Sequence, residues 1–214
     1  LQLEELSFYT TRVLGKICTP DKLQAMTQNI ERAAQELLTA RVNIILYACT
    51  AASMLNGTEW EANLMKKLQT ITQVPVISTA GSVAKALHSL QIKEVNMFTP
   101  YIHDINLAEK NFLSQSGIHV IGMEGLEITQ SVEIGDVKPE TIFKEVIALE
   151  RKNPNSQGFF ISCTNFQTFS IIHKLEEELK KPVITSNQAS LWNLFKTINY
   201  QKNISTLGQL FTQA

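Results

Sequence analysis

Two Cys-Thr pairs occupy corresponding places in a block of sequence that occurs twice. Cys49-Thr50 follows the apolar run NIILYA, and Cys163-Thr164 follows the apolar run GFFIS. Each pair is followed by a second unit, VPVIS after the first pair and KPVIT after the second, and then by a segment compatible with a helix. The duplication predicts two copies of one α/β half, with a thiol in each copy.

A thiol at the end of a strand is well placed for chemistry, because open α/β sheets bind ligands at the carboxyl ends of their strands. Free N–H groups at the start of the next helix favour a thiolate, so we expect lowered pKa values for Cys49 and Cys163. The same N–H groups, with the hydroxyls of Thr50 and Thr164, are suited to holding an anionic oxygen. These features predict a two-cysteine enzyme. Cys18 lacks such a context and is interpreted as an ordinary small apolar residue.

The composition excludes several other classes of protein. The chain has 214 residues, 44% of them hydrophobic, and a formal net charge of −1, so neither disorder nor a nucleic-acid-binding face is indicated. No apolar run reaches the roughly 18 residues that a membrane-spanning helix needs. The odd count of three cysteines argues against a disulfide framework and for a reducing compartment, so we expect the cytoplasm.

The sequence lacks the motifs that typically bind a metal or a nucleotide. The four histidines are scattered without metal-ligand spacing, and neither a GxGxxG motif nor a phosphate-binding Walker loop is present. We therefore expect no cofactor and no metal.

Strand-like and helix-like segments alternate, which predicts parallel sheets with right-handed crossovers. The expected fold class is α/β, with two pseudo-twofold-related, Rossmann-like (flavodoxin-like) half-domains and the active site between them. The first half-domain comprises residues 1–92 plus 188–214 and carries Cys49; the second comprises 93–187 and carries Cys163. Expected strands lie at 6–13, 42–48, 74–78, 94–98, 118–123, 158–162 and 183–186. Expected helices lie at 21–39, 59–70, 79–90, 104–116, 139–151, 166–179 and 188–198, with a polar loop at 129–136 and a short final helix in the tail.

Five motifs resemble the aspartate/glutamate racemase superfamily, and more narrowly its maleate cis–trans isomerase and arylmalonate decarboxylase branch. They are ACTAAS at 48–53, AGSVAKAL at 80–87, FTPY at 98–101, SCTNFQT at 162–168 and KPVITSNQASLW at 181–192. Asn165 stands where the amino-acid racemases carry a histidine, which argues against a glutamate or aspartate racemase. The decarboxylases keep one cysteine, at the second site, whereas this chain has both, which favours an isomerase.

The resemblance implies a cofactor-independent isomerase of a small unsaturated dicarboxylate, of the maleate-to-fumarate type, and a homodimer. Cys49 would add to an alkene carbon as the nucleophile, and Cys163 would protonate and later deprotonate the neighbouring carbon. The substrate contacts that the resemblance implies fall on Thr50, Ala51, Tyr101, Ser131, Thr164 and Asn165. Among these, Tyr101 would donate to a carboxylate, and Ser131, where relatives often carry an asparagine, hints at a different or bulkier substrate.

Relatives begin with a strand that ends in a Pro-x-x-Asn motif, and nothing in this sequence matches it. We therefore expect the first half-sheet to lack its central strand.

Three other functions stay open on the residues alone: a two-thiol racemase or epimerase, a decarboxylase that needs only Cys163, and a non-catalytic carboxylate-binding protein.

Overall fold

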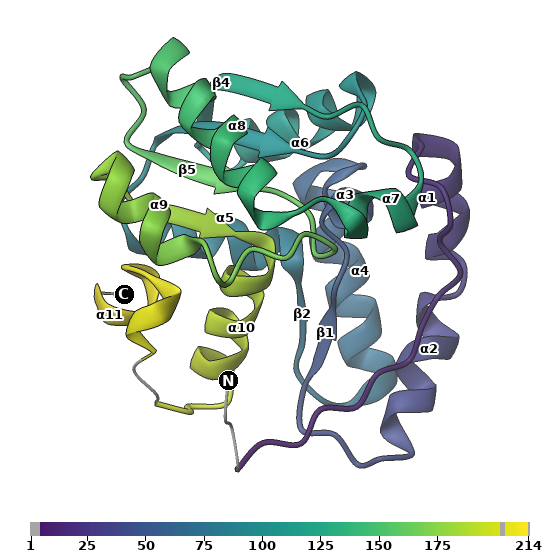
Figure 1. Ribbon diagram of the computed structural model, residues 1–214. Coiled ribbons are helices and arrows are strands. Elements are labelled where there is room, and N and C mark those ends of the chain that lie inside the picture. The colour runs from purple at the N-terminus through teal and green to yellow at the C-terminus, as the bar shows by residue number, and fades with distance from the viewer. Residues whose placement is uncertain (1–4, 202–203, 214) are drawn as a thin grey trace.

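The computed structural model describes residues 5–201 and 204–213 and has two parallel β-sheets (Figure 1). The smaller sheet pairs β1 (Ile45–Tyr47) with β2 (Val76–Ser78). The larger sheet has the order β4-β3-β5-β6, with β3 at Glu94–Thr99, β4 at His119–Gly125, β5 at Gly158–Ile161 and β6 at Val183–Thr185. The prediction of an α/β fold with parallel sheets is confirmed.

Helices connect the parallel strands. They are α1 (Pro20–Thr27), α2 (Ile30–Leu38), α3 (Thr50–Met54), α4 (Gly57–Thr72), α5 (Thr79–Ser89), α6 (His103–Gln115), α7 (Ser131–Asp136), α8 (Pro139–Lys152), α9 (Ile172–Leu179), α10 (Ser186–Thr197), the 3-10 helix η1 (Ser205–Leu207) and α11 (Leu210–Gln213). In Figure 1 the four-stranded sheet lies above β1 and β2, with α8 and α9 in front of it and α6 behind. None of the helices in the described ranges is long and apolar enough to cross a bilayer.

Helices α5 and α10 join the two sheets, since each contacts both β2 and β6. They pack against each other through short polar side chains: the Ser190 hydroxyl bonds to Thr79 Oγ1 at 3.0 Å, and Asn193 Nδ2 donates to Ser82 Oγ at 2.9 Å. All four side chains are buried, so these bonds satisfy groups that water cannot reach. The two helices follow equivalent strands of the duplicated block, which places the internal pseudo-symmetry between them. The half-domain boundaries stay a prediction.

The larger sheet is buried on both faces. Along β5, Phe159 and Ile161 belong to the apolar cluster under α8, while Phe160 belongs to the cluster that includes residues of α5, α6 and α10. This alternation follows from the two-residue period of a strand. It explains why the strand reads as a continuous apolar run, as is typical of parallel sheets covered by helices.

Two predictions for the first 40 residues are wrong. The segment 6–13 forms no strand; it runs extended over the surface, with Phe8 60% and Tyr9 57% exposed, and Ile17 makes an isolated bridge to Gln130. The single helix expected at 21–39 is two helices, α1 and α2. The break falls at Gln28–Asn29, and the Thr27 hydroxyl bonds back to the Gln24 carbonyl, a competition with helical bonding that short polar side chains favour.

Two further predictions near the second cysteine are also wrong. The polar loop expected at 129–136 contains α7, because Ile134 is buried in the main core and anchors a helical turn. The helix expected at 166–179 begins only at Ile172. Residues before it turn inward instead, since Phe166 is buried against Phe98 and its carbonyl accepts a bond from Asn187 Nδ2 at 3.3 Å.

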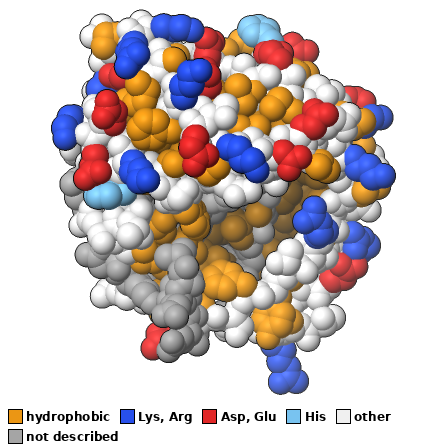
Figure 2. All heavy atoms as spheres, in the orientation of Figure 1, with side chains coloured by type: hydrophobic (Ala, Val, Ile, Leu, Met, Phe, Trp, Pro, Cys, Tyr) orange, Lys and Arg blue, Asp and Glu red, His pale blue; other side chains and the backbone are white. Residues whose placement is uncertain are grey.

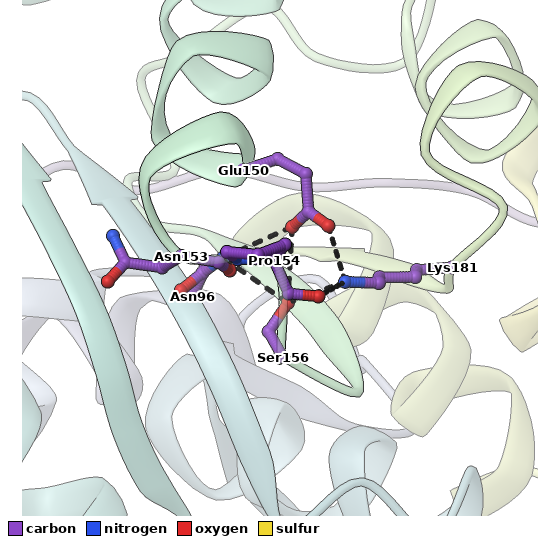
Figure 3. Close-up of polar contacts among 6 residues, drawn as sticks. All are labelled: Asn96, Glu150, Asn153, Pro154, Ser156 and Lys181. Carbon is purple, nitrogen blue, oxygen red and sulfur yellow. Dashed lines mark hydrogen bonds and ion pairs between the residues drawn. The ribbon is translucent and has the colours of Figure 1, made fainter.

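A polar cluster fixes the amino-terminal end of the larger sheet, opposite the two Cys-Thr pairs (Figure 3). Lys181, just before β6, pairs with Glu150 of α8 and donates to the Pro154 carbonyl at 2.6 Å. Asn96 of β3 donates to Ser156 Oγ at 3.2 Å and also approaches Glu150. Lys181 and Glu150 are 19% and 18% exposed, so the pair is largely shielded from water.

We expect Lys181→Met to lower the free energy of unfolding by about 2–3 kcal/mol, because it leaves the Glu150 carboxylate without its cation in a mostly buried place. Urea unfolding followed by circular dichroism measures the change. The matched control is Lys152→Met, which removes an exposed pair with Glu124 and should cost less than about 1 kcal/mol. Equal losses in the two variants would contradict the role given to the cluster.

Candidate active site

Cys49 lies at the carboxyl end of β1, one residue before α3. Its side chain is partly exposed, while Thr50 and Ala51, in the first turn of α3, are buried. The Ala52 N–H hydrogen-bonds the Cys49 thiol, and the Ser53 hydroxyl donates to the Cys49 carbonyl at 2.6 Å. The strand-to-helix turn therefore fixes this cysteine and directs backbone donors toward its sulfur.

Cys163 occupies the equivalent place after β5, in an unusual backbone conformation. Its φ is +100°, a region that residues with a side chain rarely adopt. Its own N–H donates to Ser186 Oγ at 3.0 Å, and the Asn165 N–H donates to its sulfur at 3.3 Å. Asn187 Nδ2 holds the same turn through the Thr164 carbonyl at 3.0 Å. Strain of this kind persists only where surrounding contacts enforce it, and it concentrates at functional sites.

The hydroxyl of Ser186 joins the two cysteine turns. Besides accepting from the Cys163 N–H, it accepts from Thr50 Oγ1 at 2.8 Å, and Thr50, Ser186 and Cys163 are all buried. The carboxyl ends of β1, β5 and β6 therefore meet at one oxygen atom. Sequence reasoning did not select Ser186, although it lies inside the SNQ stretch that carries the family resemblance.

Tyr101 lies beside Cys163 and is 3% exposed. Its hydroxyl is within hydrogen-bonding reach of the Cys163 thiol, which lowers the pKa of Cys163 and raises that of Tyr101. Asn106 of α6 holds the tyrosine's loop, since its Nδ2 donates to the Tyr101 carbonyl at 3.0 Å and its Oδ1 accepts from Thr99 Oγ1. Tyr101 thus lies beside the second cysteine, while its donation to a substrate carboxylate stays a prediction.

Ser131 and Asn165 lie together at the rim. Asn165 Nδ2 donates to the Ser131 carbonyl at 2.6 Å, and the Ser131 hydroxyl donates to the Gly15 carbonyl at 3.1 Å. The Ser131 hydroxyl is also 3.6 Å from the Cys18 sulfur. Cys18 is partly exposed and packs against the main core, and its charged form would raise the pKa of both Cys49 and Cys163.

The predicted threonine contacts are engaged within the protein. The Thr50 hydroxyl donates to Ser186, and the Thr164 hydroxyl lies 3.4 Å from the Ala48 carbonyl, so it bridges from one cysteine turn to the other. Within the described residues, the N–H groups of Thr50 and Ala51 bond to no carbonyl or side chain of the protein. An anionic group would therefore be held here by backbone donors rather than by the threonine hydroxyls.

Burial dominates the electrostatics of the two thiols. It raises the pKa of Cys49 to about 12, against the bond from the Ala52 N–H, and that of Cys163 to about 12, against the bonds from Tyr101 and the Asn165 N–H. The prediction of lowered pKa values is therefore wrong for the ligand-free protein: the N–H donors are present, but the cost of desolvating a thiolate is larger. Both cysteines are neutral thiols near pH 7.

We expect slow alkylation of Cys49 and Cys163 by iodoacetamide at pH 7, with rates that rise continuously up to pH 10, because only the thiolate reacts. Peptide mass spectrometry separates the three cysteines, and a short cysteine-containing peptide supplies the reference rate. Alkylation of either residue at pH 7 faster than that of the reference peptide would contradict the raised pKa values.

Ser186→Ala should lower the free energy of unfolding by about 1–3 kcal/mol, because the buried Cys163 N–H then loses its acceptor. Denaturant unfolding measures the loss. Ser89→Ala is the control: its hydroxyl bonds to the Ala86 carbonyl of its own helix, so we expect a change within about 0.5 kcal/mol. A Ser186→Ala variant as stable as the parent would show that this hydroxyl does not hold the site together.

Comparison with known proteins places the chain among characterised relatives. Residues 4–211 match the sequence model of the arylmalonate decarboxylase family. A maleate isomerase from Alcaligenes faecalis is 23% identical over 214 residues, which are 98% of this chain and 84% of that protein.

Solved structures share the fold. A double-substituted variant of arylmalonate decarboxylase in its liganded form superposes with a TM-score of 0.95 at 22% identity, covering 99% of this chain and 91% of that one. The maleate cis–trans isomerase of Nocardia farcinica, as a variant with a covalently bound succinylcysteine intermediate, superposes with a TM-score of 0.91 at 23% identity, covering 97% and 86%. The family match over nearly the whole length shows that the chain belongs to the arylmalonate decarboxylase family.

Proposed function

We propose that this protein is a cofactor-independent isomerase that converts a small cis-unsaturated dicarboxylate of the maleate type into its trans isomer. The observation that carries the proposal is the convergence of two cysteine turns, from equivalent strands of the two sheets, on the single hydroxyl of Ser186. Isomerising a conjugated double bond requires a nucleophile and a proton donor on one substrate, and two thiols supply both.

The proposed reaction begins when the partly exposed Cys49 thiol loses its proton to water and the resulting thiolate adds to one alkene carbon. The π electrons move to the neighbouring carbon, which takes the proton of the Cys163 thiol, and a succinyl adduct on Cys49 results. The former double bond is now single and rotates. The Cys163 thiolate then removes the proton, the C–S bond breaks, and the trans alkene leaves with both cysteines restored.

The remaining site residues hold the charges that develop. Tyr101 stabilises the Cys163 thiolate that forms after proton transfer, since its hydroxyl donates to that sulfur. The N–H groups of Thr50 and Ala51 are suited to one substrate carboxylate. Thr164 and Asn165 would line the opposite side. Ser131 contributes indirectly, because its carbonyl accepts from Asn165 Nδ2 while its hydroxyl and its N–H are engaged with the Gly15 and Lys16 carbonyls.

One relative supports a covalent adduct on a cysteine. The structure of the Nocardia farcinica isomerase contains a succinylcysteine, the kind of adduct that the proposed addition gives. In the present chain a cysteine is available at both positions of the duplicated block.

We expect maleate incubated with the protein to yield fumarate, which proton NMR detects directly. Cys49→Ser and Cys163→Ser should each lower kcat by roughly a thousandfold or more, because each removes one half of the chemistry. Cys18→Ser serves as the control for thiol loss, with a change of at most a few-fold. Full turnover by the Cys49→Ser variant would overturn the proposal.

A decarboxylase is the second candidate, favoured by the match of residues 4–211 to the arylmalonate decarboxylase family. That reaction would need only Cys163, so release of carbon dioxide from an arylmalonate by both the parent and Cys49→Ser would establish it. Deuterium incorporation at a stereocentre in D2O would indicate a racemase or epimerase. Dicarboxylate binding without turnover, unchanged when both cysteines are serine, would indicate a binding protein.

The proposal extends to the assembly and the compartment. The family resemblance favours a homodimer, which sedimentation measures. The three cysteines are free in the structure, in keeping with a reducing compartment such as the cytoplasm.

A further inference from the structure

Glu109 is a buried carboxyl group that the proposed reaction does not use. It lies on α6 and is 0% exposed. Its Oε1 accepts from the Ser162 hydroxyl at 3.0 Å, while its Oε2 has no hydrogen-bond partner within the part of the chain that the structure describes. A carboxylate in this setting would be costly, because burial without a cation or a full set of donors disfavours the charge.

The other largely buried glutamates are satisfied. Glu176 accepts from the Val183 N–H at 3.0 Å through one oxygen and from the Gln209 N–H at 2.9 Å through the other. Glu150 is paired with Lys181. The incomplete bonding of Glu109 is therefore particular to its position and not a general feature of this core.

That position is close to the site: the Glu109 charge raises the pKa of Cys49 and Tyr101, and Glu109 bonds to the residue before Cys163. Ser162, the partner of Glu109, precedes Cys163 in the chain, and α3, which begins after Cys49, packs against α6. One turn earlier on α6, Asn106 holds the loop of Tyr101. Glu109 thus bonds to the residue before Cys163, and its helix packs against or holds the segments that carry Cys49 and Tyr101.

We propose that Glu109 is a positioning residue that supports the site in its protonated form, and that its ionisation disables the site by placing a negative charge behind both the nucleophile and a dianionic substrate. The part of this inference that concerns the substrate rests on the proposed function; the part that concerns the thiols does not.

The electrostatics agree with the geometry. Burial raises the pKa of Glu109 to about 8, and the Ser162 hydroxyl partly opposes the shift. The carboxyl is therefore neutral at pH 7 and ionises as the pH rises through about 8. The elements packed against α6 include α3, α4 and β4, and the titratable groups that sense the Glu109 charge are Cys49 and Tyr101, whose pKa values it raises. No cation among the described residues offsets it.

The first test is the pH dependence of maleate isomerisation. In the parent, kcat/KM relative to that of Glu109→Gln should decline above about pH 8, and KM should rise, as Glu109 ionises, because deprotonation of Cys49 raises the rate in both proteins. Glu109→Gln, which matches the neutral acid in shape but cannot ionise, should remove this change. Ser162→Ala removes the bond that lowers the pKa of Glu109, so its decline should move to higher pH. Glu176→Gln, a substitution of a buried glutamate elsewhere in the fold, is the control and should keep the parent's profile.

The second test does not depend on any enzymatic function. Alkylation of Cys49 by iodoacetamide, read by peptide mass spectrometry at pH 8–10, should be several-fold faster in Glu109→Gln than in the parent, because the negative charge behind the thiolate is gone. Faster alkylation without any isomerase activity would uphold the inference about the thiols while removing the proposed function.

The inference is overturned if Glu109→Gln keeps both the parent's pH profile and its alkylation rates. If that variant does not fold, Ser162→Ala decides: an unchanged decline, or one that moves to lower pH, would overturn the inference. A uniform loss of activity in Glu109→Gln at every pH, with alkylation unchanged, would indicate a merely structural role and would overturn it as well.

Discussion

One buried oxygen holds the two halves of this protein in register where they meet. The Ser186 hydroxyl accepts from the Cys163 N–H and from Thr50 Oγ1, so the ends of β1, β5 and β6 cannot separate without leaving buried polar groups unpaired. Helices α5 and α10 support this junction, because the short side chains of Thr79, Ser82 and Ser190 allow the two helices to approach closely. Everything proposed for the chemistry depends on this alignment of the carboxyl ends of the strands.

The junction also determines how charge is handled. The same packing that aligns the cysteines excludes water, and the loss of hydration outweighs the N–H donors that point at each sulfur. The thiols are therefore neutral before the reaction, and each becomes a thiolate only during addition or proton transfer. An ionised Glu109 would oppose formation of the Cys49 thiolate, so the proposed chemistry requires a protonated Glu109 carboxyl. Figure 2 shows a hollow near the centre of the molecule, in the region of β1 and β2. Hydrophobic side chains line it, so the surroundings of the smaller sheet are apolar.

The sequence predicted the features that the duplicated block repeats and missed residues that matter through a single tertiary contact. The parallel strands and the two cysteines at their ends follow from local pattern and duplication, because apolar runs and strand ends are encoded nearby in the chain. Tyr101 was predicted from the family resemblance alone. Ser186 and Glu109 were missed, since their importance arises from contacts between residues far apart in sequence. The extended course of 6–13 and the late start of α9 were mispredicted for the same reason: tertiary contacts around Phe166, and the lack of a partner strand for 6–13, outweighed local propensity. The direction of the pKa shifts of the two thiols was mispredicted, because it depends on their burial, which the spacing of residues in the sequence does not reveal.

The central claim is that Cys49 and Cys163 act on opposite ends of one double bond. It is tested most directly by incubating the Cys163→Ser variant with maleate and locating any adduct by peptide mass spectrometry. The account predicts that Cys49 gains the mass of one maleic acid, because water can slowly supply the proton that Cys163 normally gives, while the serine hydroxyl is too weak a base to remove that proton again. Cys49 left unmodified at saturating maleate, or an adduct on Cys18 instead, would contradict it.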